Sequence, residues 1–70
     1  MDTNEFLHKV SVETNVNIEL LKDLSGNDKF LGFLKSGKKN EAIFLIRSLQ
    51  NRVDLWEAKK VVELFMEEYK

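Results

Sequence analysis

Lys38 and Lys39 are the side chains in this sequence best placed to bind an anion, because they stand at the expected start of a helix. The free backbone N–H groups and the positive end of the helix dipole would add to their two charges there. The pair belongs to a basic segment, residues 35–60, in which seven Lys and Arg outnumber three Asp and Glu. Such a segment can recruit phosphate groups or an acidic protein surface.

No residue set in the sequence has the spacing of a catalytic or metal site. His8 is the only histidine, and no Cys and no suitably spaced Glu accompanies it as a metal ligand. The four serines have no base partner at a suggestive spacing. A chain of 70 residues has little room for the desolvated cleft that general acid–base catalysis needs. The sequence therefore predicts a protein that is not an enzyme and holds neither a metal ion nor a cofactor.

Length and composition predict one small helical domain, residues 1–70. The absence of Cys excludes disulfides and fits a reducing compartment, so we expect a cytoplasmic protein. No apolar run approaches the roughly 20 residues that span a bilayer, and residues 1–5 do not resemble a signal peptide. Pro is absent and Gly occurs three times, which favours helices joined by short turns.

Three short helices are expected in the first half of the chain, each started by a polar capping residue. Asp2 starts the first helix, and Glu5 completes a capping box. Gly26 and Gly37 are expected to end the second and third helices, because glycine accepts the left-handed conformation found at helix ends. We expect the first helix to end near residue 14, the second to span residues 18–24 after the cap Asn17, and the third to start at residue 27 or 28.

The second half of the chain is expected to form a helical hairpin. Its first arm, from about residue 40 to residue 51, is helical rather than extended, because its polar flanks continue a helical period. Asp54 starts the second arm and forms a capping box with Glu57. The predicted fold is thus an all-α, compact bundle of four to five short helices built around a C-terminal helical hairpin. The expected hairpin core is Ala42, Ile43, Ile46, Leu55, Ala58, Val62 and Phe65.

Residues 34–63 resemble the helical hairpin in the C-terminal domain of the bacterial ribosomal stalk protein, and small stand-alone bacterial proteins that share only this hairpin. The matching residues are Gly37, Lys38, Lys39, Glu41, Ala42, Ile43 and Arg47 in the first arm and Leu55, Glu57, Ala58, Lys59 and Val62 in the second. The resemblance implies a hairpin that contacts partner proteins through basic and aliphatic side chains. The corresponding residues here are Lys39, Ile43, Arg47 and Lys59.

Phe44 and Trp56 stand where that family carries exposed lysines. Two large rings left in water would give a small monomer a needless apolar patch. We therefore expect them to be covered, either by the first helix of the chain or by another molecule. The expected outcome is mixed, with Phe44 inside the fold and Trp56 at the edge of a binding face.

The preferred hypothesis is a small protein-interaction module, an accessory or inhibitor protein of the kind that a phage or mobile element encodes. It would dock a larger protein through an apolar helical face with a basic rim. Two alternatives are nucleic-acid or nucleotide binding through residues 35–60, and a structural homo-oligomer that closes over the two aromatic rings. The expected partner-binding residues are Lys38, Lys39, Ile43, Phe44, Arg47, Trp56, Lys59 and Lys60.

Nucleic-acid binding is expected to be absent at physiological salt, because the sequence pI is about 5.8 and acidic residues flank the basic segment on both sides. A gel-shift assay at that salt measures this directly. A complex of low-micromolar affinity that disappears in a Lys38→Glu, Lys39→Glu double variant would overturn the preferred hypothesis.

Overall fold

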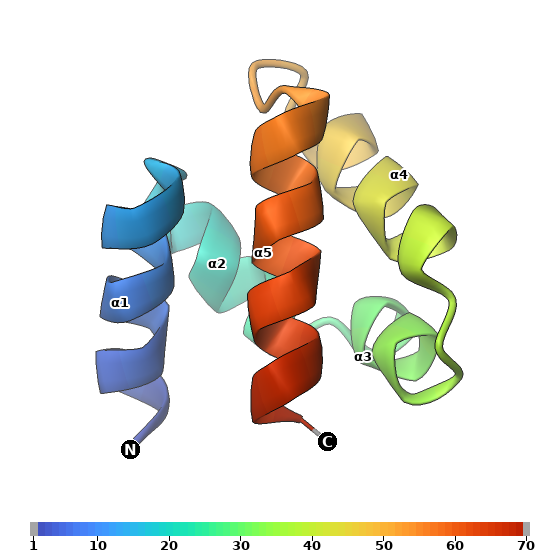
Figure 1. The fold of residues 1–70 in the computed structure, drawn as a ribbon, viewed down its shortest axis with the longest axis horizontal. Helices are drawn as coiled ribbons and strands as arrows, with labels where there is room; N and C mark the ends of the chain where they lie inside the picture. The colour runs from blue at the N-terminus through green and yellow to red at the C-terminus, as the bar shows by residue number, and fades with distance from the viewer. Residues whose placement is uncertain (1, 70) are drawn as a thin grey trace.

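The computed structural model describes residues 2–69, which form five α-helices and no strand (Figure 1). The predicted all-α class is confirmed. The elements are α1 (Thr3–Thr14), α2 (Ile18–Ser25), α3 (Asp28–Lys35), α4 (Lys39–Leu49) and α5 (Leu55–Glu68).

The longest helix, α5, lies at the centre of the arrangement and packs against α1, α3 and α4 (Figure 1). Its most extensive packing is with α4, so the two arms of the predicted hairpin do lie against each other. The helices α1 and α5 run antiparallel, and α2 connects the α1 side of the bundle to α3. The outer side of α5 carries no other helix, and this determines where functional residues can be exposed.

The core is organised around the ring of Phe65 on α5. Its centroid lies 5.2 Å from that of Phe6 on α1 and 5.4 Å from that of Phe30 on α3, both in edge-to-face geometry. Edge-to-face pairs add roughly 0.5–1.5 kcal/mol each to the burial of the rings. All three rings are buried, so this cluster joins the first, third and last helices of the chain.

The predicted hairpin core is correct except for Leu55, which is 58% exposed. Leu55 is the first residue of α5, and the chain leads into it from the side. Val53, in the connection between α4 and α5, is buried and occupies this end of the core. The apolar period of α5 predicts that Leu55 faces inward. Because the helix only begins at this residue, the prediction fails there.

Helix capping agrees with the sequence at most ends. The Asp54 carboxylate accepts a hydrogen bond of 2.8 Å from the Glu57 backbone N–H, and the Glu57 carboxylate accepts one of 3.2 Å from the Asp54 N–H, so the predicted capping box forms. At α1, Asp2 accepts from the Glu5 N–H, which is half of the predicted box. The side chains of Asn17 and Asn27 cap α2 and α3.

Gly37 has a φ of +71° and ends α3 as expected. The Lys38 N–H donates to the Phe33 carbonyl over 2.8 Å and the Gly37 N–H donates to the Leu34 carbonyl over 3.2 Å, which is the Schellman arrangement. Gly26 also ends its helix as expected, but the expected left-handed conformation is wrong, because its φ is −103°. There the helix ends in a tight turn, in which the Gly26 and Asn27 N–H groups each reach back three residues.

Two glycine substitutions are expected to change stability in opposite directions. Gly37→Ala places a Cβ in the left-handed region and should lower the free energy of unfolding by about 1–2 kcal/mol. Gly32→Ala lies inside α3, where an added Cβ meets no atom within 4 Å, and should raise it by about 0.5–1 kcal/mol. Urea unfolding followed by circular dichroism measures both. Equal effects of the two substitutions would contradict the backbone assignment at Gly37.

Candidate partner-binding surfaces

One of the seven cations of the basic segment predicted from the sequence is paired with a carboxylate. Lys39 on α4 donates a hydrogen bond of 2.8 Å to the Glu63 carboxylate on α5, which links the two helices and neutralises the lysine. Lys38 is the N-cap residue of α4, and no side chain caps this helix end. The anion site expected at Lys38 and Lys39 is thereby reduced to a single available lysine.

Glu63 is held in its charged form by this contact. The hydrogen bond from Lys39 lowers the pKa of Glu63 below its ordinary value, and the charges of Lys39, Lys59 and Lys60 act in the same direction. Partial desolvation of the carboxylate opposes them and is outweighed. The carboxylate therefore takes part in holding α4 against α5.

Phe44 lies on the outer surface of α4 and is 76% exposed, so the expectation that it lies inside the fold is wrong. Ala42, Ile43 and Ile46 occupy the inward face of α4, and Phe44 falls on the opposite side of the helix. The first helix packs on α2 and α5 and leaves the ring uncovered.

The ring of Phe44 borders an open groove of about 420 Å³ between α3 and α4, here called the α3–α4 groove. Its exposed lining is mostly apolar, and it also includes Asn40, Ser48 and one charge of each sign. A second hollow lies on the other side of Phe44, toward Arg47 and Asn51. The residues lining the α3–α4 groove include Lys29, Phe33, Glu41, Phe44, Leu45 and Ser48.

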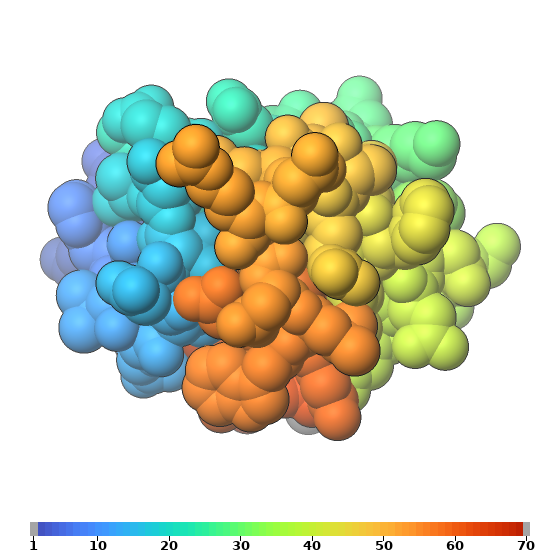
Figure 2. Space-filling model, turned by 90° about the horizontal axis from the view of Figure 1, so that it is seen from above, coloured from blue at the N-terminus to red at the C-terminus, as the bar shows by residue number. Residues whose placement is uncertain are grey.

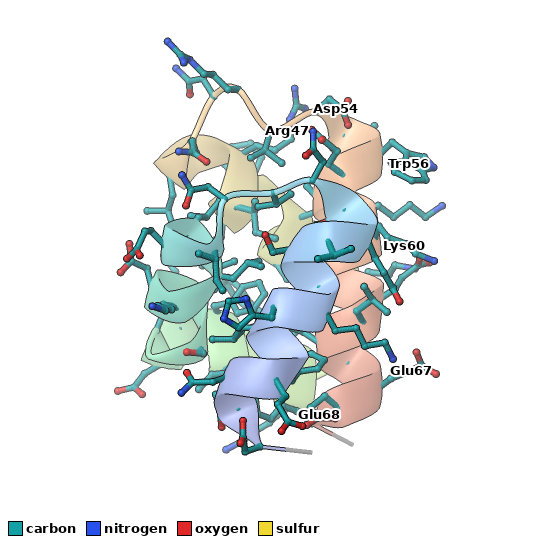
Figure 3. All side chains as sticks on the ribbon, turned by 90° about the vertical axis from the view of Figure 1, so that its left-hand side faces the viewer. Arg47, Asp54, Trp56, Lys60, Glu67 and Glu68 are labelled. Atoms are coloured by element: carbon teal, nitrogen blue, oxygen red, sulfur yellow. The ribbon has the colours of Figure 1, made fainter. Side chains whose placement is uncertain are left out.

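Trp56 is 65% exposed near the start of α5, and its indole points away from the body of the protein (Figure 3). Lys60 and Glu67 project from the same side of the helix. Figure 2 shows the end of the molecule at which α5 begins. In this view the connection from α4 to α5 lies between the α1–α2 side and the α4 side. Trp56 lines neither the α3–α4 groove nor the hollow on the other side of Phe44.

The eight predicted partner-binding residues thus separate into distinct groups. Phe44 and Arg47 line adjoining hollows on α4, whereas Trp56, Lys59 and Lys60 belong to α5. Ile43 is buried against the core, so its expected role in direct partner contact has no exposed side chain to support it and stays a prediction. Phe33 and Leu45 were not predicted as groove residues. Their spacing from the buried positions of α3 and α4 could be read in the sequence and was the signal available for them.

A third hollow, of about 220 Å³, lies between α1 and α5 and is here called the α1–α5 hollow. Most of its exposed lining is polar and comes with charged side chains, while its apolar residues are partly or fully buried. No expectation from the sequence included it, because it depends on how α1 sits against α5. The lining residues are Phe6, Lys9, Val10, Leu64, Glu67 and Glu68.

Residues 2–69 contain no group of three or more His, Cys, Asp or Glu side chains that could hold a metal ion. Within the same range, no helix has the length and apolar character needed to cross a membrane.

No protein-family description, no curated protein sequence and no solved structure matches this chain. The resemblance of residues 34–63 to the ribosomal stalk hairpin therefore stays a prediction.

The ion pair between Lys39 and Glu63 is expected to make stability depend on pH in the acid range. Because the pKa of Glu63 is lowered in the folded protein, its contribution is present above the pKa of the unfolded chain and is lost as the pH falls through the folded pKa. Glu63→Gln should therefore show a smaller loss of unfolding free energy than the unmodified protein between about pH 6 and about pH 3.

Urea titrations at several pH values measure this difference. Glu13→Gln is the control, because Glu13 is exposed on α1 and forms no salt bridge within residues 2–69. An unchanged pH profile in Glu63→Gln would show that the ion pair does not contribute to folding.

Proposed function

We propose that this protein is a small protein-interaction module without enzymatic activity, which docks a larger protein through the α3–α4 groove. The observation that carries the proposal is Phe44, a ring 76% exposed beside a groove lined by Phe33 and Leu45. A large exposed ring in an apolar groove is the composition of an interface anchor rather than of ordinary protein surface.

The dimensions of the groove fit a few side chains of a partner. Its volume of about 420 Å³ lies within the range of specific ligand sites, and it is open along one side, as an extended or helical segment requires. Lys29 and Glu41 line the groove, and Arg47 lines the adjoining hollow on the other side of Phe44. These charges orient a partner segment, and the apolar side chains of the groove supply the affinity.

Partner binding is favoured over nucleic-acid binding by the distribution of charge. Lys39 is paired with Glu63, and Lys38 and Arg47 lie at opposite ends of α4. Nucleic-acid affinity depends on several cations that contact neighbouring phosphates together, and this arrangement does not provide them. The proposed role is that of an accessory or inhibitor protein acting in the cytoplasm on one larger protein.

Phe44→Ala is expected to abolish partner binding and to leave folding intact. The ring is exposed, so the free energy of unfolding should change by no more than about 0.5 kcal/mol. Loss of a central aromatic anchor should weaken binding by about 2 kcal/mol or more, which is roughly thirtyfold. Affinity capture from lysate of the native host, followed by titration of the captured protein, measures the loss.

Val12→Ala is the matched control, because Val12 is 83% exposed on α1, away from the groove. It should bind like the unmodified protein. Equal retention of the captured protein by Phe44→Ala and by Val12→Ala would refute the groove as the docking site.

A further inference from the structure

The outer face of α5 carries an ordered row of side chains. Trp56, Lys60, Glu63 and Glu67 follow one another at spacings of four, three and four residues, which places them on one side of a helix. The labelled members of this row project together, away from the other helices (Figure 3). The row begins with an exposed indole and ends beside the α1–α5 hollow, which Glu67 helps to line.

The indole and the hollow have complementary chemistry. Leu64 contributes apolar surface to the hollow, with Phe6 and Val10 buried beneath it, and the volume of about 220 Å³ accommodates one aromatic side chain. Glu67 and Glu68 at its edge supply carboxylates that can accept a hydrogen bond from the indole N–H. The Lys9 ammonium at the same edge can lie over the face of a bound ring.

Trp56 cannot reach this hollow in its own chain, because eleven residues of helix, about 16 Å, separate it from Glu67. A second copy removes that obstacle. If two α5 helices pack antiparallel around a two-fold axis midway between Lys60 and Glu63, Trp56 of each copy comes opposite Glu67 of the other. Each indole then stands at the α1–α5 hollow of the opposite copy, and the contact closes on itself.

The same register brings opposite charges together. The first half of the row carries the base Lys60, and the second half carries the acids Glu63 and Glu67. In the antiparallel pair, Lys60 comes opposite Glu63 and one helical turn from Glu67 of the other copy. The parallel arrangement would instead place Lys60 against Lys60, so the charges select the antiparallel one.

We propose that this protein forms a symmetric homodimer through the outer face of α5, with Trp56 of each copy seated in the α1–α5 hollow of the other. The contact area is limited. A standard interface covers about 800 Å² on each partner, which is about a sixth of the 4651 Å² surface of this chain, and a single helix face covers less. The dimer is therefore weak, with a dissociation constant on the order of micromolar. It leaves the α3–α4 groove free and does not rest on the proposed function.

The dimer is tested first by sedimentation equilibrium over a range of protein concentrations. Trp56 is the only tryptophan, so its emission should shift to shorter wavelength as dimers form. Trp56→Ala should remain folded by circular dichroism and sediment as a monomer throughout. Phe44→Ala is the matched control, an exposed ring on another face, and should dimerise like the unmodified protein. It also separates the two proposals, because it should lose only partner binding.

A charge exchange tests the antiparallel register. Lys60→Glu and Glu67→Lys should each weaken self-association by about tenfold or more, because each places like charges across the axis. An equimolar mixture of the two variants should dimerise again, because the carboxylate introduced at position 60 of one chain then lies within a helical turn of the ammonium introduced at position 67 of the other. Glu63 is left unchanged in both, because it is bonded to Lys39.

Three results would overturn the proposal. They are a protein that sediments as a monomer at every concentration, a dimer that survives Trp56→Ala, and a mixture of the charge variants that associates no better than either variant alone.

Discussion

The contacts of the Phe65 ring with Phe6 and Phe30 are the interaction on which the rest of the structure depends. They join α5 to the first and third helices, and α4 is held against α5 by its own apolar face and by the bond between Lys39 and Glu63. A helix surrounded in this way has one side left for solvent. The chain places its tryptophan on that side, so the exposed position of Trp56 follows from the central position of α5.

Much of this fold could be predicted from the sequence, because its helix ends are marked locally. The cap at Asp54, the left-handed Gly37 and the break after Thr14 each depend on a few neighbouring residues. The errors arose where tertiary packing decides. Leu55 fits the apolar period of α5 yet lies beyond the core, and Gly26 ends a helix without a positive φ because a tight turn serves instead.

The candidate site was harder to predict for the same reason. Residue type suggested that Phe44 and Trp56 act together, but the helical rotation of α4 and α5 exposes them separately. The number of positive charges suggested a basic patch, but Lys39 is paired with Glu63 across the hairpin. The two acids of the capping box, Asp54 and Glu57, form hydrogen bonds at the start of α5. The grooves and hollows lie between helices, and the packing of these helices depends on the whole fold. A local sequence pattern therefore does not predict them.

The packing of α1 on α5 also bears on how the chain is made. Most helix pairs in this bundle are neighbours in sequence, and such pairs can form as soon as both members are synthesised. The partner of Phe6, however, is Phe65, almost a full chain length later. During translation the part of the apolar face of α1 that packs on α5 therefore stays uncovered until α5 has left the ribosome. In that interval a chaperone that binds apolar segments can bind it.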